Sequence, residues 1–158
     1  MKYQKPAGLI LALILFCAGL SAQDHAPINE PDMNKPRLFD HLPAEIPVAI
    51  TELKGLLLTT PQQGKEVSLR MADQKLAPFA GKVISSASKY DNKLRSVVIK
   101  SAEFNGATLT LSSSTQPDGT VTFQGRIISF QHADLYELQL KNNQYYLVKK
   151  NFYDLVNE

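Results

Sequence analysis

The chain has 158 residues, which is enough for one domain with a buried core. Its 17 basic and 15 acidic residues give a formal net charge of only +2, so it lacks the concentrated positive charge that nucleic-acid binding requires. Its single cysteine, Cys17, excludes an internal disulfide and a metal site built from several cysteines.

Residues 1–22 have the layout of a secretory signal peptide. Two lysines precede the apolar run 7–20, and small residues follow it up to Ala22. The run is shorter than the roughly 20 residues that a membrane-spanning helix needs. We therefore expect cleavage after Ala22 rather than an uncleaved signal anchor. The bulky Phe16 before Cys17 argues against lipid attachment to that cysteine.

Cleavage would change the composition of the mature chain. The chain would lose its cysteine and the two leader lysines, which leaves 15 of the 17 basic residues against 15 acidic ones. A cysteine-free chain has no thiol nucleophile, so its stability depends on the core alone. We predict an exported protein, periplasmic or secreted, with no membrane span after cleavage. The "SAQ" ending is similar to signal peptides of Bacteroidetes-type bacteria, which implies a bacterial source.

Residues 23–45 are predicted to form a proline-rich flexible tether. Prolines remove backbone donors and favour extended conformations, and the segment holds few large apolar side chains. Such a segment cannot offset the entropy that it would lose on ordering. Near its end, Leu38, Phe39 and Leu42 surround His41, and we expect this cluster to pack on the edge of the domain.

The domain itself is predicted to span residues 46–158 and to begin with an amphipathic helix. The helix is indicated by apolar residues at spacings of three and four: Ile46, Ile50, Leu53 and Leu57. Pro47 suits the first helical position, and Pro61 would end the helix. We expect the apolar face to cover one side of a sheet.

From Lys65 onward the apolar residues follow the two-residue period of half-buried strands, as in 66–71, 106–112 and 120–127. The segments 96–100 and 145–150 are apolar at consecutive positions. These two strands are expected to be covered on both faces or to carry a bulge.

Turn signals such as Asn105-Gly106 separate the strands and supply the positive φ angles of tight hairpins. The predicted fold is therefore mainly β (α+β). One N-terminal amphipathic helix packs on an antiparallel meander of about seven strands, which forms a curled sheet or a half-closed barrel.

Residues 129–138, "SFQHADLYEL", place His132 two residues before Asp134. Turn signals near residues 92, 105 and 118 are evenly spaced, and the next one is expected here, so we interpret the stretch as a turn between strands. In a hydrolase the pair would be base and orienter, but the serine runs lack the glycine-flanked elbow of a nucleophilic serine. Two ligands are too few for zinc, and we expect no metal and no cofactor. His132, Asp134 and Tyr136 remain candidate binding residues.

The leading functional hypothesis is a non-catalytic exported module that binds an unknown protein or glycan. We therefore predict no enzyme activity and no catalytic residue. The alternatives are a small hydrolase working through His132, or a propeptide-like inhibitor of an exported protease that acts by strand addition. A deep polar pocket at His132 would favour the hydrolase, and a long unpaired edge strand would favour strand addition. The stretch 125–150 is similar to small β-modules attached to exported bacterial proteins, which implies no role for any particular residue.

Overall fold

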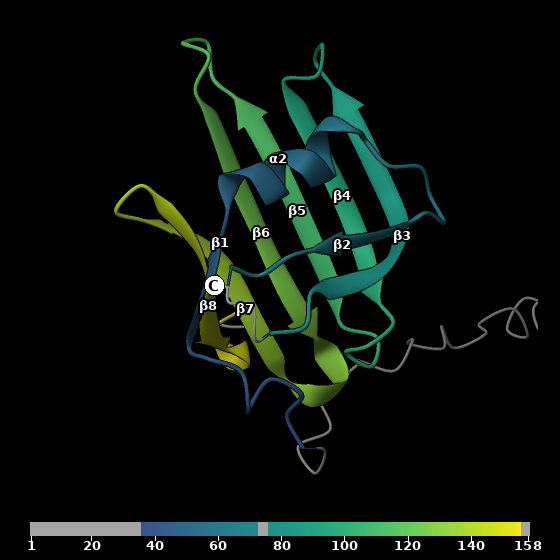
Figure 1. The fold of residues 1–158 in the computed structure, drawn as a ribbon, viewed down its shortest axis with the longest axis vertical. Coiled ribbons are helices and arrows are strands. Elements are labelled where there is room, and N and C mark those ends of the chain that lie inside the picture. Colours follow the sequence, from purple (N-terminus) through teal and green to yellow (C-terminus); the bar gives the residue numbers. More distant parts are fainter. Residues whose placement is uncertain (1–35, 73–75, 156–158) are drawn as a thin grey trace, which may run out of the picture.

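The computed structural model describes residues 36–72 and 76–155, so the predicted signal peptide and the first part of the predicted tether lie outside the described residues. Within these ranges, eight strands form one antiparallel sheet with an α-helix packed on it (Figure 1). In chain order the elements are β1 (Glu45–Val48), α2 (Ile50–Leu58), β2 (Glu66–Leu69), β3 (Phe79–Lys89), β4 (Leu94–Ser101), β5 (Thr108–Thr115), β6 (Val121–Ser129), η2 (Phe130–His132), β7 (Asp134–Lys141), β8 (Gln144–Asn151) and η3 (Phe152–Leu155), where η marks a 3-10 helix. No helix in the described ranges is long and apolar enough to cross a membrane.

The sheet is a meander. Strands β2 to β8 lie side by side in chain order, and β1 adds to β8 at the far edge. Ala72, just beyond β2, donates its N–H to the Pro47 carbonyl in β1 at 2.9 Å, so the two ends of the sheet approach each other. The prediction of a mainly β fold with one helix on a curled, half-closed antiparallel sheet is confirmed, with eight strands in place of about seven.

The curl of the sheet depends on β3. A Cβ added to Gly81 would lie 2.2 Å from the Lys100 carbonyl oxygen, so only glycine allows β3 and β4 to approach this closely. The register between the two strands then shifts between Val83 and Ser85, which is the signature of a β-bulge. The bulge expected for 96–100 therefore lies in the partner strand, opposite β4.

Helix α2 lies on the inner face of the curl, against β2, β4 and β5 (Figure 1). Leu53 and Leu57 are buried as predicted, whereas Ile50 is 36% exposed. The predicted start of the helix was wrong, because Ile46 and Pro47 belong to β1. There Ile46 faces the core, and proline is tolerated because an edge strand needs ladder bonds on one side only.

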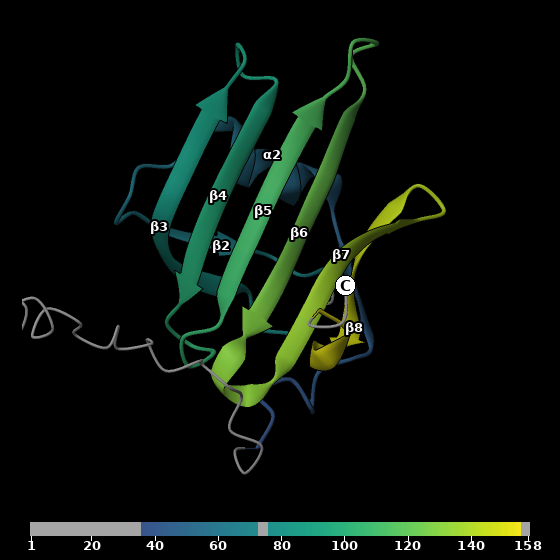
Figure 2. The same ribbon diagram turned by 180° about the vertical axis from the view of Figure 1, so that it is seen from behind.

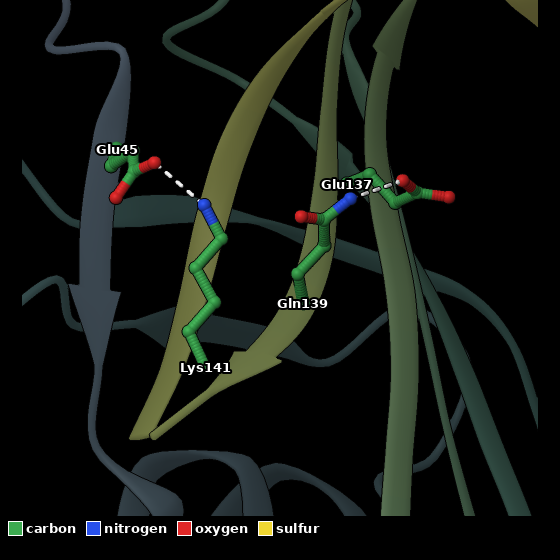
Figure 3. A network of polar contacts seen from close by, with 4 residues as sticks. All are labelled: Glu45, Glu137, Gln139 and Lys141. Carbon is green, nitrogen blue, oxygen red and sulfur yellow. Dashed lines mark hydrogen bonds and ion pairs between the residues drawn. The ribbon is translucent and has the colours of Figure 1, made fainter. Parts of the chain in front are cut away.

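A polar pair on the outer face joins β1 to the end of β7 (Figure 3). Lys141 donates from Nζ to Glu45 Oε1 at 2.6 Å, and the two side chains are 39% and 48% exposed. Nearby, Gln139 donates to Glu137 at 3.0 Å. An ion pair this exposed contributes at most about 1 kcal/mol to stability, so β1 is held mainly by its ladder bonds and by Ile46.

The main core fills the inside of the curl, with buried side chains from all eight strands and from α2. A second, smaller cluster lies on the other side of the sheet, where η3 packs: Ile128, Ala133, Leu135 and Phe152. In the middle of β4 and of β8 the inward residues are buried and their outward neighbours half-buried, whereas Leu94 and Lys100 of β4 are exposed. These strands are therefore only partly covered on their second face. Figure 2 shows the outer face of β3 to β6, over which no α-helix of the described chain lies.

Candidate functional site

The stretch 129–138 connects β6 to β7. The short helix η2 ends at His132, Ala133 adopts a left-handed φ of 52°, and β7 begins at Asp134. The interpretation as a turn between two strands is therefore confirmed. The two polar side chains are not solvated, however, because His132 is only 6% exposed and Asp134 only 4%.

Both ring nitrogens of His132 have partners. Nδ1 lies 2.9 Å from the Pro36 carbonyl oxygen, and Nε2 lies 3.3 Å from the Asn105 side-chain amide nitrogen. A carbonyl only accepts and an amide nitrogen only donates, so these contacts fit a neutral ring that carries its proton on Nδ1. No hydrogen bond joins His132 to Asp134 in the described part of the chain.

Asp134 also binds the segment before β1. Its Oδ2 accepts the Leu38 N–H at 2.5 Å. Burial raises the pKa of the Asp134 carboxyl above its ordinary value of 3.8, and the backbone N–H groups of Leu38 and Phe39 and the charge of Arg37 oppose this rise. The carboxyl is thus poorly solvated, and its strongest contact is with a backbone donor.

Tyr136 and Lys149 also bind the segment before β1. The Tyr136 hydroxyl donates to the Pro43 carbonyl at 2.5 Å, and burial, followed by the nearby Asp134 charge, raises the pKa of Tyr136 to about 12. Lys149 donates from Nζ to the carbonyls of Phe39 at 2.6 Å and Leu42 at 2.9 Å. The same Nζ lies 5.9 Å from the centre of the Tyr136 ring, close enough for a cation–π contact.

All three candidate binding residues therefore contact one short segment. We call residues 36–44 the arm, and we call His132, Asp134, Tyr136 and Lys149 the clamp. The arm belongs to the sequence predicted as tether, yet it lies against the sheet. Phe39 is 2% exposed, and its ring centre is 5.8 Å from that of Phe104 and 5.4 Å from that of Tyr136. The expected packing of this cluster on the domain is confirmed, with Leu38 and Leu42 partly buried beside Phe39.

A hollow of about 780 Å³ lies elsewhere, on the outer side of β2, β3 and β4 around Gly81. Its charged lining residues are Glu66, Lys82, Lys100 and Glu103, and none of them forms an ion pair within the described chain. Lys82 and Lys100 are direct cross-strand partners, an arrangement in which like charges repel. In the described ranges, no three His, Cys, Asp or Glu residues are grouped so that they could hold a metal ion.

The edge of β3 extends beyond β2. β2 pairs with β3 over Phe79–Lys82, whereas β3 continues to Lys89. We call residues 84–89 the free edge, because they have β4 on one side and no strand of the described chain on the other. Ile84, at its start, is 44% exposed.

The direction of the backbone groups along the free edge follows from the neighbouring strands. Ser101 donates its N–H to Ala107, which shows that the odd-numbered residues of β4 bond to β5. In an antiparallel sheet the even-numbered residues of β4 then bond to β3. Their register partners in the free edge are odd-numbered, so the N–H and C=O groups of Ser86 and Ser88 point away from the sheet.

Sequence reasoning found three of the four clamp residues but missed Lys149 and the free edge. The signal for Lys149 was its position in β8, because every second side chain of a strand points to the same face and Lys149 follows the inward Tyr145 and Leu147. The free edge depends on where β2 stops, for which the sequence carries no local signal.

Comparisons of the chain with models of protein families, with curated proteins and with solved structures gave no match.

Proposed function

We propose that this chain is an exported, non-catalytic interaction module that binds a protein partner by strand addition at the free edge of β3. The observation that carries the proposal is the unpaired side of residues 84–89. There Ser86 and Ser88 direct their N–H and C=O groups away from β4, on the side where an extended partner segment would form a ladder with them. Main-chain groups in this arrangement suit a polypeptide better than a glycan.

The other edges of the sheet are less open to a partner. β1 and β2 have four residues each, and Pro47 of β1 already accepts the Ala72 N–H. Short edge strands and proline are common ways of protecting an edge. In β3 the bulge at Val83 and the charge of Lys89 protect only the ends of the free edge, which leaves small side chains between them.

The clamp contacts support a non-catalytic role. A general base needs a ring nitrogen within reach of the substrate's proton. In His132 both nitrogens are engaged and the side chain is buried, so this observation favours the module over the hydrolase.

A propeptide-like inhibitor would use the same free edge, with an exported protease as the partner. Export itself is part of the proposal and is supported by the predicted signal peptide 1–22.

The test compares Ser86→Pro with Ser86→Ala. Proline removes the outward N–H and blocks an added strand without removing a bond to β4, whereas alanine removes only the hydroxyl. We expect wild type and Ser86→Ala to retain the same partner from the native exported fraction, and Ser86→Pro to lose it. Circular dichroism and urea denaturation check that both variants keep the fold.

Two results would count against the proposal. Retention of the partner by folded Ser86→Pro would show that the free edge is not the binding surface. A hydrolytic activity that is present in wild type and absent from His132→Asn, in a broad hydrolase screen, would overturn the non-catalytic role.

A further inference from the structure

The clamp holds the arm as a binding protein holds a peptide. We propose that His132, Asp134, Tyr136 and Lys149 form a peptide-binding groove that is occupied by residues 36–43 of its own chain and that accepts the same residues from a second copy. The groove lies at the β6–β7 end of the sheet, and the free edge of β3 runs toward the β3–β4 hairpin at the opposite end (Figure 1). This inference is therefore independent of strand addition.

Every hydrogen bond from the clamp to the arm reaches the backbone. The clamp side chains bind four carbonyl groups and one N–H: those of Pro36, Phe39, Leu42 and Pro43, and that of Leu38. The Leu42 N–H donates to the Phe39 carbonyl at 3.0 Å, so the bound segment is a turn rather than a strand. The exposed arm side chains Arg37, Asp40 and His41 accept or donate none of these bonds. The groove thus recognises a main-chain shape.

Selectivity comes from one side chain of the arm. Phe39 inserts among aromatic rings and is 2% exposed, and Leu38 and Leu42 pack beside it with partial burial. A matching peptide therefore needs an aromatic residue at the position of Phe39 and a leucine three residues later. Phe39–Leu42 of the arm has this spacing and carries the carbonyls that the clamp binds, whereas Phe152–Leu155 has the same spacing but is packed in the second core cluster. A second copy's arm is therefore the occupant that fits.

Residues 36–43 of the arm could leave the groove without breaking a ladder bond of the sheet. The arm's first ladder bond is the Lys149 N–H to the Ala44 carbonyl at 2.8 Å, and residues 36–43 pair with no strand. Linkage to β1 gives the arm a high effective concentration at its own groove, so the chain's own arm wins in dilute solution. A second copy's arm takes the groove when the resident arm is weakened.

The test uses two full-length variants with complementary defects. Phe39→Ala weakens the arm but leaves the clamp intact, and Lys149→Ala weakens the clamp but leaves the arm intact. We expect an equimolar mixture to form a 1:1 complex in native mass spectrometry, while each variant alone stays monomeric at the same concentration. As the matched control, Phe39→Ala is mixed with the double variant Phe39→Ala/Lys149→Ala, which has no intact arm to donate.

The result that overturns the proposal is the absence of the complex when both variants show the circular dichroism of wild type. If Phe39→Ala does not fold, hydrogen exchange of the wild-type chain decides instead. The amides of Leu38 and Leu42 should then exchange at least about tenfold faster than those of core strands, because the arm opens locally. Equal exchange rates for the arm and the core would show that the arm leaves only on global unfolding, and the proposal would fail.

Discussion

At the residue scale, the polar side chains that were candidates for binding or catalysis stabilise the backbone of the arm. His132, Asp134 and Tyr136 are 6%, 4% and 1% exposed, and each binds a backbone group of the arm. Buried polar groups are costly unless they are hydrogen-bonded, and here the arm provides the partners. The dependence is mutual, since the arm has no strand pairing of its own before Ala44.

The first prediction concerns His132→Asn. At a solvated turn this change would alter the free energy of unfolding by only about 0.5 kcal/mol. Because both ring nitrogens are bonded and the side chain is buried, we expect a loss of about 1–3 kcal/mol. Urea denaturation measures the difference. His41→Asn is the control, because His41 is exposed on the same arm and should change stability little. Equal effects at the two positions would contradict the prediction.

A second prediction concerns the pH dependence of stability through Asp134. Its pKa is raised in the folded protein above 3.8, chiefly by burial. The protonated carboxyl therefore contributes stability that is fully present below pH 3.8 and is lost as the pH rises through the folded pKa. Asp134→Asn keeps an oxygen that can accept the Leu38 N–H but cannot titrate.

The measurement is urea denaturation of wild type and Asp134→Asn at steps from about pH 3 to about pH 7, a range that brackets ordinary carboxyl pKa values. The stability of wild type relative to Asp134→Asn should fall with rising pH and then level off. A relative stability that rises with pH would mean that the backbone donors outweigh the burial of the carboxylate.

At the element scale, the spacing of the apolar residues bears on where a strand ends and the helix begins. Ile46 matched the helical spacing of the residues after it, but Ile46 and Val48 also alternate around Pro47, and this two-residue period is the one the structure adopts. β1 gains its stability from β8, whose sequence lies about a hundred residues away. The spacing of neighbouring residues therefore could not show whether Ile46 belongs to a helix or to a strand. The helix begins after Ala49, which has the extended backbone of an N-cap residue.

The third prediction uses this boundary. Leu53 of α2 is fully buried on the side of the helix that faces the sheet, so Leu53→Ala should lower the free energy of unfolding by about 2–5 kcal/mol. Ile50 is 36% exposed in the first turn, so Ile50→Ala should cost about 1 kcal/mol or less. Thermal and urea denaturation of the two variants provide the comparison. Similar losses at both positions would place the helix in a different rotation on the sheet.

At the scale of the whole molecule, the half-closed sheet separates two surfaces. The arm and clamp lie at the β6–β7 end, and the free edge of β3 approaches the opposite end (Figure 1). One surface is already occupied by the chain itself, and the other carries unpaired backbone groups. A partner bound at the free edge would therefore leave the arm in place.

The fourth prediction concerns the mature chain. The basic start, the apolar run 7–20 and the small residues up to Ala22 predict removal of residues 1–22 on export. Intact-mass spectrometry of the native protein should give the mass of a chain that begins at Gln23. A native protein that retains the apolar run would contradict export by this route.

The sequence by itself determined the sheet class, the hairpins and the strands other than β1, because these depend on local properties. Alternating apolar residues define one face of a strand, and pairs such as Asn105-Gly106, whose φ angles are 33° and 78°, adopt the backbone that a tight turn requires. The tertiary structure alone decided what the polar residues do. Asp134 binds Leu38 across 96 positions of the chain, and Lys149 reaches Phe39 across 110. Such contacts arise from the register of the curled sheet and the path of the arm across it, and neither is encoded within a window of neighbouring residues.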